Sequence, residues 1–88
     1  MKKTIVLYCY LYERNSDKWG AKVNNRELSY YSLTADKLDK SRAAITKSDG
    51  SYEYEGVLGS AFSGGKLYIN FNRDTKFEKG ELVRIEIL

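Results

Sequence analysis

Histidine is absent from this chain of 88 residues, and cysteine occurs only once. Histidine is the commonest general base and metal ligand in proteins, so its absence removes the conventional Ser-His and Cys-His nucleophile pairs. A single cysteine is too few for a structural zinc site and cannot form an internal disulfide. We therefore expect a non-enzymatic protein that needs no metal or other cofactor and works in the reducing cytoplasm.

Proline is also absent, and no apolar run approaches the roughly 20 residues that a membrane span needs. The segment after Met1-Lys2-Lys3 has the outline of a secretory signal, but tyrosines interrupt it and a charged stretch follows at residues 13–15. We expect neither a cleaved signal nor a membrane contact. The chain has no proline-rich linker and no internal repeat, which predicts a single small domain over residues 1–88.

Tyrosine is abundant, and three of the eight tyrosines lie in the uncharged run from Thr4 to Tyr12. Side chains alternate between the two faces of a β-strand. As a strand, this run turns its aliphatic residues and Cys9 toward the core, and Tyr8, Tyr10 and Tyr12 the other way. These tyrosines either pack beneath a helix with only their hydroxyl groups in water, or face water as a contact surface.

Short segments of alternating apolar and polar residues recur along the chain, separated by turn-forming residues. They centre on 19–23, 28–30, 52–55, 67–71 and 83–87. With the first run they predict an α+β fold that is rich in β-structure. We expect a small sheet or partly open barrel of five to six short, mainly antiparallel strands.

One helix is predicted over about residues 35–47, packed on one face of the sheet, because alanines and long charged residues replace the β-branched ones there. Thr34 suits its N-cap. Three strands, a helix and two strands is also the element order of an oligonucleotide-binding barrel. The segment Leu82–Leu88 adds a further strand, whose edge could pair with a second copy and give a homodimer.

The glycine-rich segment Gly59–Leu67 is a near miss to a phosphate-binding loop. Lys66 comes one residue too late, Leu67 stands where a hydroxyl residue is needed, and the next segment reads as a strand. We therefore expect a hairpin connection in which the glycines supply positive φ.

The best functional signal is the alternation of aromatic and basic residues near the start of the chain. Residues 1–48 hold ten basic and five acidic side chains, whereas 49–88 hold five and seven. Tyrosine, tryptophan and arginine are enriched among interface hot spots. We predict a surface that engages, and inhibits or regulates, a partner protein, formed by Tyr8, Tyr10, Tyr12, Arg14, Lys18, Trp19 and Lys22, with Lys2 and Lys3 nearby.

A single-stranded nucleic acid is the alternative partner, because bases stack on aromatic rings while lysine and arginine neutralise phosphates. Glu13, Asp17 and Glu27 lie close in sequence to the basic residues, which favours the protein partner. Glu53 and Glu55 could project from one face as a carboxylate pair. The sequence shows no metal partner for this pair, so we expect a solvated strand face there.

Overall fold

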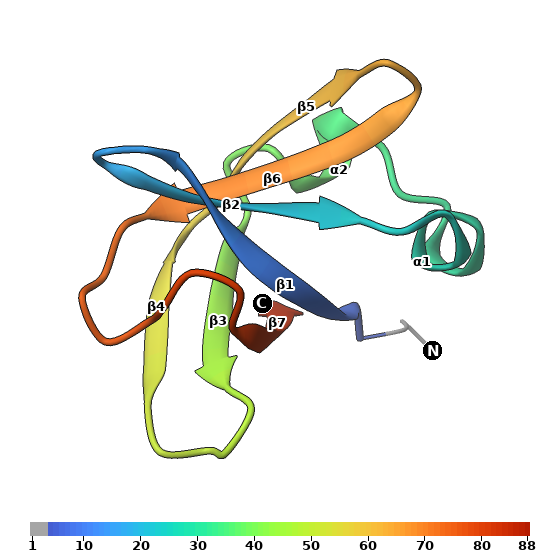
Figure 1. Ribbon diagram of the computed structural model, residues 1–88. Helices are drawn as coiled ribbons and strands as arrows, with labels where there is room; N and C mark the ends of the chain where they lie inside the picture. The colour runs from blue at the N-terminus through green and yellow to red at the C-terminus, as the bar shows by residue number, and fades with distance from the viewer. Residues whose placement is uncertain (1–3) are drawn as a thin grey trace.

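A computed structural model describes residues 4–88, which form seven strands and two short helices (Figure 1). The strands are β1 (Val6–Asn15), β2 (Lys18–Val23), β3 (Arg42–Lys47), β4 (Glu53–Val57), β5 (Gly59–Ser63), β6 (Lys66–Asn72) and β7 (Leu82–Ile87). The helices α1 (Asn25–Tyr31) and α2 (Ala35–Leu38) lie between β2 and β3. The predicted β-rich, antiparallel character is confirmed, but the strands exceed the expected five to six. Neither helix is long and apolar enough to cross a membrane.

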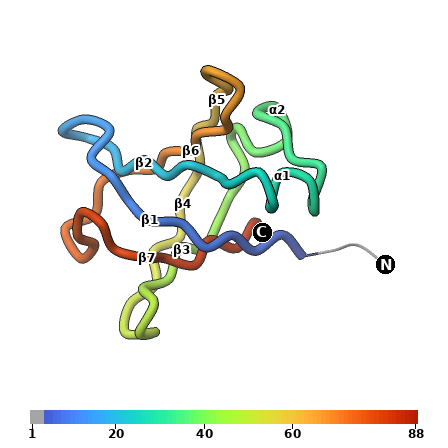
Figure 2. The backbone as a smooth tube through the Cα atoms, turned by 45° about the vertical axis from the view of Figure 1, so that its right-hand side comes forward, coloured from blue at the N-terminus to red at the C-terminus, as the bar shows by residue number. Residues whose placement is uncertain are grey.

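The strands form one antiparallel sheet in the order β4-β3-β7-β1-β2-β6-β5. Its two edge strands, β4 and β5, follow each other in the chain, and only Leu58 separates them. The chain thus passes from one edge of the sheet to the other, and the sheet curls into a half-barrel (Figure 1, Figure 2). Across its interior, the rings of Tyr54 on β4 and Phe71 on β6 stack with their centroids 5.9 Å apart.

The concave face of the sheet carries the core, and β1 shows the alternation that its sequence predicts. Leu7, Cys9 and Leu11 are buried, while the tyrosines between them point outward. Burial of such apolar side chains supplies the main favourable free energy of folding. The other buried members of the core cluster are Trp19, Ala21, Val23, Leu33, Leu38, Ala43, Ile45, Leu58, Leu67, Ile69, Phe71, Phe77, Val83 and Ile85.

The prediction of one helix over residues 35–47 is wrong in extent. Thr34 is the N-cap, as predicted, because its Oγ1 accepts a hydrogen bond from the Lys37 N–H at 3.2 Å. The helix ends at Leu38, however, and the later alanines belong to β3. This strand pairs with β4 on one side and β7 on the other. Its pairing and burial override the modest helix propensity of alanine, which is only a weak local preference.

The strand expected around Leu28 and Tyr30 is a helix, α1. Asn24 caps it, since its Oδ1 accepts a hydrogen bond from the Glu27 N–H at 2.9 Å. Leu28 and Tyr31 then lie three residues apart on one side of the helix and pack against the core. Two helices now follow the second strand, so the element order differs from that of an oligonucleotide-binding barrel.

Strand β7 lies inside the sheet, between β1 and β3. Ile85 illustrates this position, because it is the register partner of Leu7 on one side and of Ile45 on the other. The expected edge-to-edge pairing of this strand with a second copy is therefore wrong: such pairing needs a free edge.

The expected hairpin connection at Gly64-Gly65 is confirmed. Ser63 pairs with Lys66 across the turn, and the two glycines have φ values of 57° and 74°. A two-residue type I′ turn requires positive φ at both central positions, which glycine adopts without steric cost. The segment connects β5 to β6 and leads into no helix, unlike a phosphate-binding loop.

Candidate protein-binding surface

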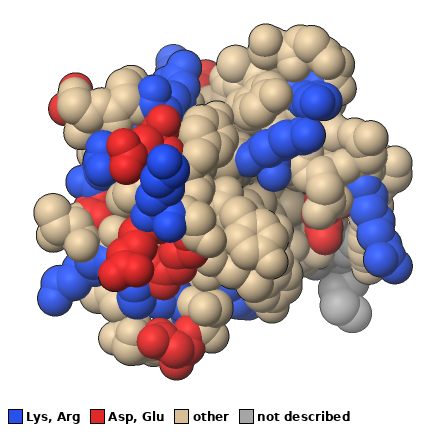
Figure 3. Space-filling model, in the orientation of Figure 1, with Lys and Arg blue, Asp and Glu red and all other residues tan. Residues whose placement is uncertain are grey.

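Tyr8, Tyr10 and Tyr12, which we call the tyrosine row, lie on the convex outer face of the curled sheet. Their side chains are 56%, 69% and 36% exposed. In the orientation of Figure 1, Figure 3 shows an uncharged area in the middle of the view, where β1 and β2 run. Of the two arrangements that the sequence allows for this row, the structure has the one in which the rings face water.

On one side, the tyrosine row adjoins β7. Tyr8 is the register partner of Arg84, and Tyr10 that of Leu82. Arg84 Nη1 donates a hydrogen bond to Glu86 Oε1 at 2.9 Å, and this bond is the main reason why the pKa of Arg84 is raised. A shallow cavity of about 400 Å³ lies beside Tyr8, between these β7 residues and the β3–β4 turn. On the β7 side, the tyrosine row therefore adjoins a cavity. Arg84, which lines this cavity, already pairs with Glu86.

Tyr12, at the other end of the row, lies over Gly20 of β2, its register partner. A Cβ atom on Gly20 would lie 2.6 Å from Cε2 and 2.7 Å from the hydroxyl oxygen of the Tyr12 ring. Only glycine therefore leaves room for the ring to rest on the strand. Partial burial raises the pKa of Tyr12, and the nearby charge of Arg14 opposes this shift. The ring is held at the surface with Arg14 close to it.

On its other side, the tyrosine row adjoins basic residues of β2 and β6. Lys22 is the register partner of Tyr68, and Lys66 lies diagonally from it on the same face. The nearby amine of Lys66 lowers the pKa of Lys22, because two positive charges close together repel each other. Lys18 Nζ donates a hydrogen bond to Asn72 Oδ1 at 2.6 Å. Two aligned strands thus present lysines beside the aromatic rings.

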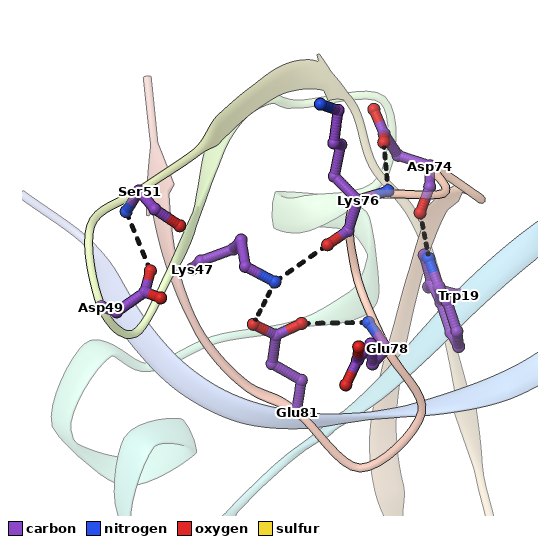
Figure 4. A network of polar contacts seen from close by, with 8 residues as sticks. All are labelled: Trp19, Lys47, Asp49, Ser51, Asp74, Lys76, Glu78 and Glu81. Atoms are coloured by element: carbon purple, nitrogen blue, oxygen red, sulfur yellow. Dashed lines mark hydrogen bonds and ion pairs between the residues drawn. The ribbon is translucent and has the colours of Figure 1, made fainter.

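Trp19 is misplaced in the sequence-based prediction, because it belongs to the core and not to the outer face. Only 3% of it is exposed, and its Nε1–H donates to the backbone oxygen of Asp74 at 3.1 Å (Figure 4). The Arg73 guanidinium lies over the indole, 4.6 Å from its centroid. Since neighbouring residues of a strand face opposite ways, placing Lys18 and Gly20 outward turns Trp19 inward.

A network of polar contacts fixes the loop between β6 and β7, which holds Asp74 (Figure 4). Lys47 Nζ pairs with Glu81 Oε2 at 2.7 Å and donates to the Lys76 backbone oxygen at 2.9 Å. Glu81 Oε1 accepts a hydrogen bond from the Glu78 N–H at 3.0 Å. The bond to Glu81 is the main cause of the raised pKa of Lys47. These contacts are structural, and they leave the outer face of β1 and β2 unobstructed.

Apart from Trp19, the predicted contact residues do lie on or beside the tyrosine row: Tyr8, Tyr10, Tyr12, Arg14, Lys18 and Lys22. Lys2 and Lys3 fall outside the described residues. The structure adds neighbours from distant strands that sequence reasoning misses: Lys66, Tyr68, Leu82 and Arg84. Alternation on β6 and β7 indicates that these four face away from the core, but it says nothing about which strand lies next to β1.

The carboxylates Glu53 and Glu55 project from the outer face of β4, and each has a neighbour on β3. Glu55 Oε1 pairs with Arg42 at 2.7 Å, and Glu53 Oε1 accepts a hydrogen bond from Thr46 Oγ1 at 3.4 Å. Within residues 4–88, no group of three or more His, Cys, Asp or Glu side chains is arranged to hold a metal ion. This edge of the sheet therefore has the composition of an ordinary charged strand surface.

The thiol of Cys9 is buried, and burial raises its pKa from 9.0 to about 12, with the charge of Glu27 adding to the effect. Between these values the unfolded chain loses its thiol proton while the folded chain keeps it. Stability should therefore fall as the pH rises through this window, by up to about 1.4 kcal/mol per pH unit from this group. Urea denaturation at a series of pH values measures the slope. A Cys9→Ala variant should show a shallower slope than the parent; equal slopes would contradict the prediction.

Comparisons with protein-family models, with curated proteins and with solved structures found no match. The role of the tyrosine row must therefore be inferred from its own geometry, exposure and charge.

Proposed function

We propose that this protein is a small, non-enzymatic binding protein that engages a partner protein through the tyrosine row, and thereby inhibits or regulates it. The observation that carries the proposal is the exposure of the three rings on one strand, greatest at Tyr10. Tyrosine presents a large, rigid apolar body with a polar tip, and ordering it in a complex costs little entropy. Such residues dominate the binding energy of many interfaces.

The surroundings of the row support this proposal. Protein interfaces typically combine an apolar or aromatic centre with a polar, solvated rim. Here Tyr10 and its partner Leu82 occupy the middle, while Arg14 and Arg84 lie toward the margins. The row from Tyr8 to Tyr12 extends about 13 Å along the strand at the usual rise per residue. Flanking residues on β2, β6 and β7 widen it into a continuous surface.

The Tyr10→Ala variant tests the proposal. We expect a loss of partner affinity of about thirtyfold, the effect of removing a typical hot-spot residue. Because the side chain is 69% exposed, the free energy of unfolding should change by less than about 0.5 kcal/mol. Affinity capture from extracts of the native host, with parent and variant baits compared quantitatively, measures the first effect. Urea denaturation measures the second.

Phe62→Ala is the matched control, because Phe62 is an aromatic residue on β5 with 50% exposure that lies outside the tyrosine row. It should leave capture unchanged. The proposal fails when Tyr10→Ala captures the same proteins as the parent, or when it merely lowers stability. It also fails when both variants capture equally less partner protein than the parent, since that result would reflect nonspecific binding by exposed aromatic rings.

A further inference from the structure

The charges on the outer face of the sheet are distributed unevenly, and the half formed by β3, β4 and β7 is neutralised within the protein. Arg42 pairs with Glu55 at 2.7 Å, and Arg84 pairs with Glu86 at 2.9 Å. Each arginine on this half thus already has a carboxylate beside it. A partner that bound here would have to compete with these contacts or leave them in place.

The cations on the half formed by β1, β2 and β6 have no such neutralisation. Across the described part of the chain, residues 4–88, no carboxylate lies within ion-pair distance of Arg14, Lys22 or Lys66. Lys18 donates its hydrogen bond to the neutral amide of Asn72. Lys22 and Lys66 are also close enough to each other for their charges to repel. Figure 3 shows basic side chains at the upper right of the uncharged area, with no acidic side chain between them.

Two of the three acidic residues that lie near these cations in sequence are directed elsewhere by the fold, and the third, Asp17 in the β1–β2 turn, forms no ion pair within residues 4–88. Glu13 is the register partner of the inward-facing Trp19 and pairs with Arg73 at 3.4 Å. Glu27 belongs to α1, where its charge acts on the buried thiol of Cys9. Neither carboxylate therefore compensates the lysines of β2 and β6.

We infer that the partner protein presents a carboxylate-rich surface, and that it covers the β1-β2-β6 half of the outer face. The inference rests on the proposed function and adds the chemistry and position of the contact. A carboxylate placed between Lys22 and Lys66 would relieve their repulsion, while an adjoining apolar group meets Tyr10 and Tyr12. Complementary charge at the edge of an interface speeds association and rejects partners of the wrong sign.

A single-stranded nucleic acid would also bring negative charge, but it fits this surface less well. Phosphate chains bind along a continuous basic groove. Here the uncompensated basic residues occupy only one flank of the tyrosine row, and on the other flank the carboxylates of Glu53, Glu55 and Glu86 outnumber the two arginines that pair with them. An acidic protein patch can cover one flank alone, whereas an extended strand that crosses the face meets these carboxylates.

The inference can be tested with simple probes by following backbone amide signals of the isotopically labelled full chain in NMR titrations. The first probe is a short glutamate-rich peptide with a central leucine pair. The second replaces each glutamate with lysine, the third replaces each with serine, and the fourth is an oligothymidylate of equal length. We expect the glutamate peptide to bind best and to shift signals from β1, β2 and β6. Binding should weaken as salt is added, because exposed charges are screened within about 8 Å at physiological ionic strength.

Charge reversal supplies the decisive variants. Lys22→Glu combined with Lys66→Glu should weaken binding of the glutamate peptide by about tenfold or more. Lys40→Glu combined with Lys79→Glu changes the net charge equally at exposed loop positions away from the tyrosine row and should have little effect. The amide spectrum of each variant shows directly whether it is folded.

The outcomes separate the inference from the proposed function. Equal binding of the glutamate and serine peptides, or tighter binding of oligothymidylate, overturns the acidic protein partner. Signal shifts confined to β3, β4 and β7 overturn the position that we assign to the partner. Absence of any binding by the glutamate peptide also overturns the inference. If the serine peptide binds and only Tyr10→Ala weakens it, the proposed function stands without the inference. If the glutamate peptide binds through the lysines whether or not Tyr10 is present, the role of the tyrosine row fails instead.

Discussion

Trp19→Ala is expected to destabilise the protein by about 3–5 kcal/mol, the usual cost of deleting a large buried aromatic side chain. Small domains often have a total stability of only about 5 kcal/mol. The variant should therefore keep only about 0–2 kcal/mol of stability at room temperature. The cost includes the cavity left in the core, the lost hydrogen bond to the Asp74 backbone oxygen and the lost stacking partner of Arg73.

Trp19→Phe is the matched control, because it keeps most of the apolar volume and removes the indole N–H. Leaving the Asp74 oxygen without this donor should cost about 1 kcal/mol. Since Trp19 is the only tryptophan, unfolding of both variants should be followed by far-UV circular dichroism in urea. A Trp19→Ala variant with parental stability and reduced partner binding would instead restore this residue to the contact surface.

Leu58→Ala is expected to cost about 2–5 kcal/mol, the range measured for buried leucines in other proteins. Leu58 is only 1% exposed and occupies the single position between the two edge strands. Its N–H donates to the Ser41 backbone oxygen, and its own oxygen accepts from the Lys40 N–H, both at 2.8 Å. These two backbone hydrogen bonds hold Leu58 in place at the point where the sheet curls.

The neighbouring Val57→Ala variant provides the comparison. Val57 is 51% exposed, so its truncation should change stability by less than about 0.5 kcal/mol. The two substitutions lie next to each other and remove apolar carbon from adjacent positions. The difference between their urea midpoints therefore reports the burial at Leu58. Similar midpoints for both would show that this corner is not closely packed.

Local patterns in the sequence predict the structure well where the two faces of a segment differ strongly. On β1, aliphatic residues alternate with tyrosines, so one register buries every aliphatic group at once. At Ala43 and Ala44 no such contrast exists, and the helix propensity of alanine, which is only a weak local preference, favours the wrong element. The decision comes from pairing with β4 and β7, which lie far away in sequence. The strand predicted in place of helix α1 is wrong for a related reason: Leu28 and Tyr30 fit a strand only when the Asn24 cap is ignored.

The same distinction, between what local patterns predict and what depends on pairing with distant strands, applies to the candidate surface. The outward direction of the tyrosine row, Lys18 and Lys22 follows from strand alternation alone. Trp19 shares their segment, but its own alternation with Ala21 and Val23 turns it to the core. Lys66 joins this surface only because β6 pairs with β2. Strand order depends on the whole sheet, so the uncompensated charge of this half becomes visible only in three dimensions.

The interior position of β7 constrains how the protein can be made. Because β7 lies between β1 and β3, residues 82–87 must emerge from the ribosome before the two halves of the sheet can join. Until then the facing edges of β1 and β3 lack their hydrogen-bonding partners and can associate with other chains. The two halves of the sheet therefore join only after β7 has been made, and chaperone binding to the nascent chain should end when this strand inserts between them.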